Sequence, residues 1–436
     1  MKRNTLIQHA LACLFAVTTA TAYAEEALPE YTFIDSVKAG TNMTNFRLRY
    51  EHVDQDTLSE NADAFTLRSL IGWQTAPYKN FSFAAQLIDV SKFVDDYNDR
   101  ALNRSQPGMD NYPNVVDPDN TDINQLFVDW TGIRNTKFRL GRQSVKLDNV
   151  RFIGNIEFRQ VMQVFDGIAV ENKTLPNTEI YLAHFDRVKQ INTKLRSGDL
   201  DIANVKYRFT PSESLSAYGY FSNFNDLGYT MAAGLAATPA AAETVDTSHK
   251  TLGLRLDGNR KINDDWKALY TAEYAKQNDY SGGDDRIDAH YYRLGGGASY
   301  KSWFMRFDHE TLSSNDSQYA FQTPFGTNHL FQGWADAFLV TPRQGIKDYF
   351  VTFGGKPIES ITLLGEYHAI KSDENFAIFG GGTGDTWGKE LDLSAMYTWN
   401  KNLWFKAEYA YFKEDDRAIV RKPDVEKIWL TVMYTF

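Results

Sequence analysis

The feature that most constrains this chain is an alternation of apolar and polar residues with period two in nearly every regular stretch. Residues 252–257, 391–397 and 403–409 show it most plainly, and no segment carries a sustained helical stripe of apolar residues. Successive side chains of a β-strand point to opposite faces, so this period predicts strands with one apolar and one polar face. The sequence therefore predicts an all-β fold.

The pattern yields eighteen candidate strands, an even number that suits a closed bacterial barrel. They lie near residues 44–54, 63–73, 80–90, 122–131, 136–143, 164–172, 177–186, 200–209, 213–222, 249–258, 266–275, 289–300, 303–311, 346–355, 360–369, 388–398, 403–412 and 426–436. Short turns, such as 132–135, 301–302 and 400–402, alternate with connections of eight to more than thirty residues. Short periplasmic turns and long extracellular loops produce this rhythm, so we expect a transmembrane antiparallel β-barrel.

The amino-terminal segment is typical of a secretory signal peptide. Lys2 and Arg3 precede an apolar run over Leu6–Val17, which ends in the small-residue exit Ala22–Ala24. A membrane helix is the alternative, but the run is shorter than the roughly 18 residues that a span needs. We therefore expect residues 1–24 to be removed and residues 25–436 to form a single barrel domain.

The carboxyl-terminal segment separates a membrane barrel from a soluble sandwich, because local alternation fits both. Residues 428–436 place an apolar side chain at the last position and at every second position before it. A terminal aromatic strand of this form resembles the signal recognised by the outer-membrane assembly machinery, with Phe436 as the contact. Together with the signal peptide and the loop rhythm, this strand predicts a location in the outer membrane of a Gram-negative cell. Lipid and lipopolysaccharide then surround the barrel.

Composition excludes several other functions. The only cysteine, Cys13, lies in the predicted signal peptide, so the mature chain has no thiol chemistry. Without Lys2 and Arg3 the chain has 44 basic and 56 acidic side chains, a formal charge of −12 that argues against nucleic acid. No Gly-x-Ser-x-Gly elbow or metal-spaced histidine pair occurs, and no acidic loop has the spacing of a calcium loop. We predict no enzyme activity, cofactor or metal.

The polar face of each strand would line the lumen, and a barrel of about eighteen strands leaves an aqueous bore unless loops fill it. If Phe46 and Leu48 face lipid, Arg47 and Arg49 face inward. By the same phase Arg68 and Arg139 also point to the lumen. Basic side chains in a constriction favour anions. The alternative is structural, because lumen charges must be paired or solvated whatever the pore carries.

The densest basic stretch runs from Arg139 through Arg142, Lys146 and Arg151 to Arg159. It crosses one strand and the loop that follows. The planar guanidinium of arginine can hold a sugar carboxylate with two parallel hydrogen bonds, which a lysine cannot do. This stretch is therefore the candidate constriction of the channel.

The same stretch carries a resemblance. Residues 141–143, 147–154, 158–160 and 165–167, with a second block over 324–336, resemble the signature of the alginate-export family of outer-membrane porins. The resemblance implies an eighteen-stranded monomeric barrel whose arginine-rich constriction passes an anionic polysaccharide such as alginate. It assigns Arg142, Lys146, Arg151 and Arg159 to the constriction. It also implies that Asp148, Asn149 and Asp166 organise an infolded loop.

We therefore predict an outer-membrane channel for passive diffusion of an anionic saccharide, an alginate-like polymer or oligomer, through an arginine-lined pore. A broader porin for small anionic or neutral solutes is the alternative.

Overall fold

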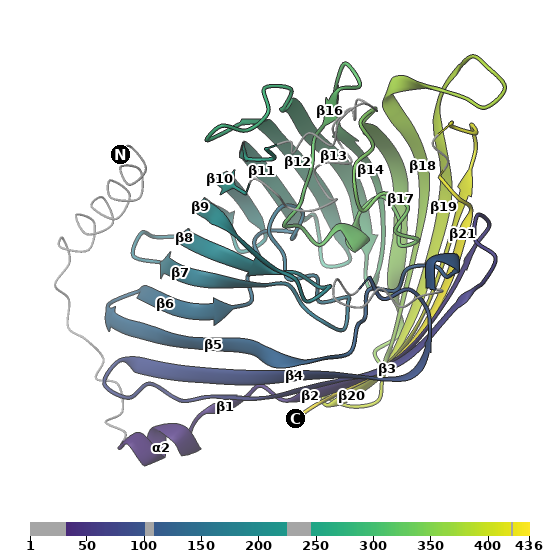
Figure 1. Ribbon diagram of the computed structural model, residues 1–436. Coiled ribbons are helices and arrows are strands. Elements are labelled where there is room, and N and C mark those ends of the chain that lie inside the picture. The colour runs from purple at the N-terminus through teal and green to yellow at the C-terminus, as the bar shows by residue number, and fades with distance from the viewer. Residues whose placement is uncertain (1–31, 101–108, 225–245, 420–421) are drawn as a thin grey trace.

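The computed structural model describes residues 32–100, 109–224, 246–419 and 422–436. The predicted signal peptide lies outside these residues. The described chain forms a closed antiparallel barrel of eighteen strands, β2–β14 and β17–β21, in which neighbours along the chain pair and β2 pairs with β21 to close the circle (Figure 1). This architecture confirms the predicted fold class.

The barrel strands are β2 (Asn45–Gln55), β3 (Ala62–Gln74), β4 (Phe81–Asp96), β5 (Asn120–Ile133), β6 (Thr136–Gln143), β7 (Val164–Asn172), β8 (Thr178–Lys189), β9 (Leu195–Thr210), β10 (Glu213–Asn223), β11 (His249–Lys261), β12 (Trp266–Asp279), β13 (Asp288–Tyr300), β14 (Trp303–Leu312), β17 (Ile346–Ile358), β18 (Ile361–Ala377), β19 (Thr383–Thr398), β20 (Leu403–Glu414) and β21 (Val425–Thr435). Minor elements are α2 (Phe33–Lys38), β1 (Thr41–Asn42), η1 (Met109–Asn111), β15 (Ser314–Asn315), β16 (Tyr319–Ala320) and η2 (Asn328–Leu330). No helix among the described residues is long and apolar enough to cross a membrane.

All eighteen predicted strands are present, but several extend further on the side of the long connections. β9 begins at Leu195 and β18 continues to Ala377, well beyond the predicted segments. As a result the connections 190–194 and 378–382 are short, where the sequence predicted long loops. Beyond the lipid band both faces of a strand can be polar, so the hydrophobic alternation ends before the backbone pairing does.

The outward face of the barrel is apolar and the inward face is polar. Leu140, Leu254, Leu294 and Phe307 are each more than half exposed on the outer wall. Inward residues such as Arg255 are buried among polar groups. This inverts the arrangement of a soluble protein, and it is what a wall between lipid and an aqueous lumen requires.

The carboxyl terminus lies beside the start of the first barrel strand. The Phe436 backbone N–H donates to the Thr44 carbonyl at 3.3 Å, and the Phe436 ring packs edge-on against Phe46 at 5.8 Å. The Phe436 side chain is 57% exposed on the outer surface. The terminal aromatic side chain is therefore accessible at the seam where the barrel closes.

Candidate functional site

Two long connections fold into the barrel and narrow its lumen (Figure 1). We call residues 144–163, between β6 and β7, the first inner loop, and residues 321–345, before β17, the second inner loop. The Gly154 N–H donates to the Phe325 carbonyl at 2.8 Å, and the Thr327 N–H donates to the Val150 carbonyl at 2.9 Å. These backbone bonds tie each loop to the other, so the constriction is one braced structure.

The two inner loops approach each other closely because a glycine stands at each side of the contact. A Cβ atom on Gly154 would lie 2.2 Å from the Thr327 Oγ1, and one on Gly326 would lie 2.2 Å from the Arg151 carbonyl oxygen. Neither separation is tolerated by a real side chain. Both glycines occur in the motif blocks of the sequence, and the contact gives a physical reason for them.

Arg151 joins the first inner loop to the second and to the barrel wall. Its Nε donates to the Glu310 carboxylate of β14 at 2.9 Å, and a terminal nitrogen donates to the Gln332 side-chain oxygen at 2.9 Å. The guanidinium also lies over the Phe331 ring, 4.5 Å from its centroid. Since the Arg151 side chain is only 1% exposed, it holds the loops in place and is not available to a passing solute.

Arg159 occupies a similar anchoring position. It donates to the Glu51 carboxylate of β2 at 3.0 Å and to the Asp336 carboxylate at 3.1 Å. Asp336 also receives the Lys427 ammonium at 2.7 Å and lies 2.8 Å from the His329 Nδ1. Burial opposes ionisation of Asp336, but Lys427, His329 and Arg159 outweigh it and hold the pKa of this carboxyl well below its usual range. Arg159 and Asp336 are therefore the centre of a buried network of opposite charges.

Asp148 fixes the first inner loop to the opposite part of the wall. Its carboxylate accepts from Asn204 of β9 at 2.7 Å and from Ser216 of β10 at 2.8 Å, and it pairs with Lys206 at 2.8 Å. Asn149 follows, and its side-chain oxygen accepts from the Arg151 N–H at 3.3 Å. Both residues therefore lie in the first inner loop, and Asp148 joins that loop to the barrel wall.

Arg47, Arg49 and Arg68 form a cluster of three guanidiniums on β2 and β3, and Arg47 stands directly opposite Arg68 in the strand register. Arg47 donates to the carbonyls of Glu157 and Arg159 at 2.7 and 2.5 Å. Arg49 donates to the Phe158 carbonyl at 2.5 Å, and Arg68 donates to the Asn45 side-chain oxygen at 3.0 Å. Within the described chain no carboxylate oxygen lies within 4.0 Å of these three guanidiniums.

Arg139 and Lys146 line one cavity of the lumen together with Asp148, Tyr181 and Lys206. Arg139 makes a two-point contact with the Asp129 carboxylate at 2.7 and 2.8 Å. The Lys146 side chain is 56% exposed and lies 2.9 Å from the Glu157 carboxylate. Lys146 is thus the most accessible cation among the residues that the sequence assigned to the constriction.

Arg142 and Asp166 lie on the outer wall, which corrects the expectation that they belong to the constriction. Arg142 is directly opposite Leu126 in the β5–β6 register, and Leu126 and Leu140 are 51% and 63% exposed on the apolar outer surface. The two charges pair with each other at 2.7 and 2.9 Å. The physical reason is the strand period: Arg139 points inward, so Arg142, three residues later, points outward.

We expect Arg142→Ala to leave single-channel conductance and ion selectivity unchanged, because the side chain does not border the lumen. Recordings from the purified variant in a planar bilayer would check this. A change in reversal potential as large as that of a lumen variant would contradict the placement.

Comparison with known proteins agrees with this geometry. The family model described as alginate export matches residues 41–332, more than half of the chain. The chain belongs to the alginate export family. The match confirms the resemblance that the motif blocks indicated. No curated protein matches the chain.

Several solved structures have the same fold as this alginate export family member. Pseudomonas aeruginosa OpdO is 12% identical with a TM-score of 0.68, and the alignment covers 93% of this chain and 99% of that one. Acinetobacter baumannii OccAB2 is 15% identical with a TM-score of 0.67, covering 92% and 98%. The outer membrane protein opdK from Pseudomonas aeruginosa is 13% identical with a TM-score of 0.65, covering 90% and 97%. Family and fold together make the chain an outer-membrane β-barrel of the porin class.

Sequence reasoning missed the partners that hold the constriction of this family member. Glu310, Gln332 and Asp336 are 159, 181 and 177 residues from the arginines they contact. Gln332 and Asp336 lie in the second motif block, so their position in a motif was the available signal. Glu51 faces inward by strand phase, but nothing in its neighbourhood indicated Arg159 as its partner.

Proposed function

We propose that this channel passes an anionic saccharide, an alginate-like polymer or oligomer, by passive diffusion along the basic wall of the lumen. The observation that carries the proposal is the cluster of Arg47, Arg49 and Arg68. Among the described residues its side-chain hydrogen bonds go to uncharged groups, chiefly carbonyl, amide and hydroxyl oxygens, so none of the three guanidiniums is directly paired with a carboxylate. Fixed positive charge beside a low-dielectric wall raises the potential along the pore and concentrates anions.

Arg68 is the most deeply buried of these three arginines. It is fully buried, and its Nε and one terminal nitrogen have no hydrogen-bond partner among the described residues. Burying a guanidinium costs free energy that a well-placed carboxylate partner can offset. The position of this guanidinium beneath the first inner loop, without a direct carboxylate partner among the described residues, supports a role in the electrostatics of the pore.

A broader channel for small anionic or neutral solutes is the second candidate. Its support is the pairing of the more accessible cations: Arg139 with Asp129, Lys146 with Glu157, and Lys206 with Asp148. Paired charges present little net field to a solute. The two candidates therefore differ in whether saccharide charge matters for passage.

The deciding experiment is a planar-bilayer measurement of reversal potential and of blockade by oligomannuronate. We expect an anion-selective wild-type channel that the charged sugar blocks, and a weaker block in Arg68→Met. A unit charge acting across roughly 10 Å of water is worth about 0.4 kcal/mol, so we expect its removal to lower the accumulation of anions by roughly twofold.

Arg142→Ala on the outer wall is the matched control, since it removes the same charge outside the lumen. A cation-selective pore that is indifferent to the sugar would refute the anionic-saccharide proposal. Equal block by a charged and a neutral oligosaccharide would favour the broader channel.

We also propose how the chain is exported and assembled into the outer membrane. Residues 1–24 act as a cleaved signal peptide, and the exposed Phe436 side chain at the seam presents the terminal strand to the assembly machinery. The folded barrel functions as a monomer surrounded by lipid and lipopolysaccharide. A Phe436 deletion would test the second point by lowering the amount of barrel in the outer membrane.

A further inference from the structure

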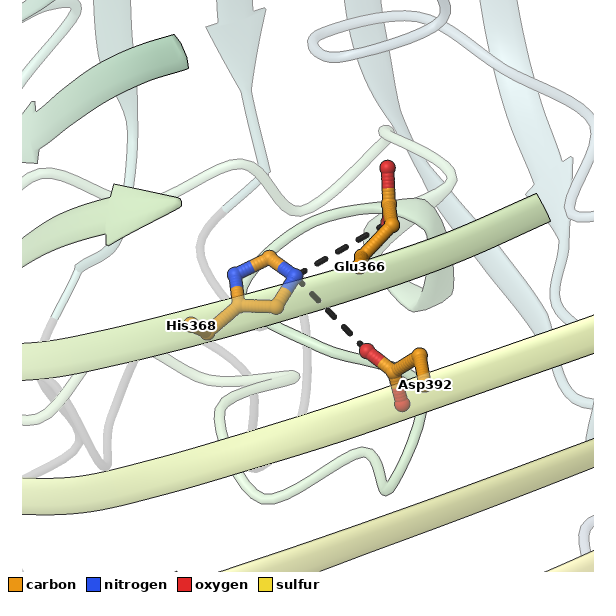
Figure 2. A group of neighbouring side chains, drawn as sticks. All are labelled: Glu366, His368 and Asp392. Atoms are coloured by element: carbon orange, nitrogen blue, oxygen red, sulfur yellow. Dashed lines mark ion pairs between the residues drawn. The ribbon is translucent and has the colours of Figure 1, made fainter. Parts of the chain in front are cut away.

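A group of three ligand-type side chains lies on the inner face of β18 and β19, away from the arginine cluster (Figure 2). His368 Nε2 lies 3.8 Å from a Glu366 carboxylate oxygen and 3.6 Å from an Asp392 carboxylate oxygen. Figure 2 shows both carboxylates directed toward the same ring nitrogen. One nitrogen and two oxygens from adjacent strands thus converge on a single point.

The His368 ring is held so that Nε2 faces this point. Its Nδ1 lies 2.8 Å from the Asp348 carboxylate of β17, and its face stacks on Phe350 with centroids 4.9 Å apart. A metal-ligating histidine commonly donates its other ring N–H to a carboxylate in this way, which fixes the orientation of the ring. The His368 residue is 2% exposed, and Nε2 has no hydrogen-bond partner in the described part of the chain.

The two carboxylates are also positioned by groups outside the cluster. The Thr352 hydroxyl donates to one Glu366 oxygen at 2.8 Å. The Trp334 N–H of the second inner loop lies 3.4 Å from both Asp392 oxygens. Metal ligands in proteins are oriented by an outer set of hydrogen bonds of this kind.

Acidic side chains predominate on this part of the wall. Glu366, Glu390 and Asp392 lie together with Asp348, and none of the first three has a lysine or arginine nitrogen within 4.0 Å among the described residues. One Glu390 oxygen is buried without a hydrogen-bond partner. Buried carboxylates must be paired, protonated or bound to a metal.

We propose that Glu366, His368 and Asp392 bind a divalent transition-metal ion of the zinc class. Bonds of about 2.0–2.2 Å to nitrogen and oxygen in a tetrahedral site place ligand atoms roughly 3.4 Å apart. The two separations from His368 Nε2 need only a small contraction to reach this value, and all three ligand atoms lie within 4.8 Å of one another. An imidazole ligand favours zinc-class ions over Ca²⁺ and Mg²⁺, which prefer oxygen ligands alone. The Glu366 side chain is 16% exposed and opens the fourth position to lumen water.

The ion would couple the barrel wall to the constriction. Asp392 receives the Trp334 N–H, and Glu390 receives the Ala335 N–H at 2.5 Å, so the metal-bearing strand also carries the second inner loop. Binding to the folded barrel alone stabilises it by mass action. Metal therefore raises the unfolding temperature of the barrel together with its inner loops. This site does not depend on which solute the channel passes.

The test is titration of the metal-free, refolded mature barrel with Co²⁺, whose visible absorption reports its ligands. We expect one equivalent to bind to the wild type, and Zn²⁺ to displace it. His368→Ala should abolish this absorption. Glu366→Gln, at the most exposed ligand, should weaken Co²⁺ binding at least roughly tenfold, the scale of losing one contributor to a metal site.

The matched control is His184→Ala, which removes another histidine paired with a carboxylate, Asp201 at 2.7 Å. No second acidic side chain among the described residues pairs with His184. This control should bind Co²⁺ as the wild type does. Heat-modified mobility on a gel identifies which variants are folded barrels. Absence of stoichiometric Co²⁺ and Zn²⁺ binding to the folded wild type, or wild-type binding by folded Glu366→Gln, would overturn the proposal.

Discussion

Arg151→Ala should destabilise the barrel by about 3–5 kcal/mol, because it leaves the Glu310 carboxylate buried without its partner. Both side chains of this pair are 1% exposed, so water cannot replace the lost contact. The inner loops also lose their shared anchor to Gln332. We therefore expect single-channel conductance to rise and to fluctuate more than in the wild type. Urea unfolding in lipid vesicles and planar-bilayer recording measure the two effects.

Two variants separate the buried pair from a general effect of charge. Lys146→Ala breaks a pair whose side chains are 56% and 49% exposed, and exposed pairs contribute about 0–1 kcal/mol. The double replacement Arg151→Met with Glu310→Leu removes both charges and should recover much of the lost stability. Equal destabilisation by Lys146→Ala and Arg151→Ala would contradict the anchoring role of Arg151.

Asp336→Ala should have an effect of similar size at neutral pH, about 3–5 kcal/mol, since Arg159 and Lys427 would both lose a buried carboxylate. The pKa of Asp336 is depressed in the folded state by Lys427, His329 and Arg159. The stability that Asp336 contributes to the folded barrel is therefore fully present above the pKa of an unfolded aspartate, about 3.9. It is lost as pH falls toward the pKa of Asp336 in the folded barrel.

The pH dependence provides the check on Asp336. The difference in unfolding free energy between wild type and Asp336→Ala should be constant from about pH 5 to pH 8 and should shrink below about pH 4. Urea unfolding at pH 7 and pH 3 measures this difference directly. A difference that grows in acid would mean that Asp336 is not a carboxylate paired with cations in the folded barrel.

The strands could be predicted from the sequence because their signal is local. Within β6, for example, Phe138 and Leu140 alternate with Lys137 and Arg139, and the observed bounds equal the predicted ones. Where the local signal ends, the prediction fails, as at the ends of β9 and β18. Backbone pairing continues there because a neighbouring strand is present to accept and donate hydrogen bonds. The residues of one segment alone do not show how far its neighbour extends.

The candidate site could be predicted only in part. The sign of a charge and the direction of its side chain follow from nearby residues, whereas its partners come from distant parts of the chain. The inward direction of Arg47, Arg49, Arg68 and Arg139 follows from strand phase. The same phase places Arg142 outside, although the motif resemblance grouped it with the constriction. Whether a buried arginine is paired directly with a carboxylate depends on what folds against it, as the contrast between Arg68 and Arg151 shows.

The sequence by itself determined the strand count, the polarity of the two faces and the family, since each rests on residues that are close in the chain. Only the tertiary structure decided how the lumen is narrowed and which charges are paired. The inner loops meet through contacts such as Arg159 with Asp336, 177 residues apart. Electrostatic energy depends on the distance between charges in space, and only the closed barrel sets those distances.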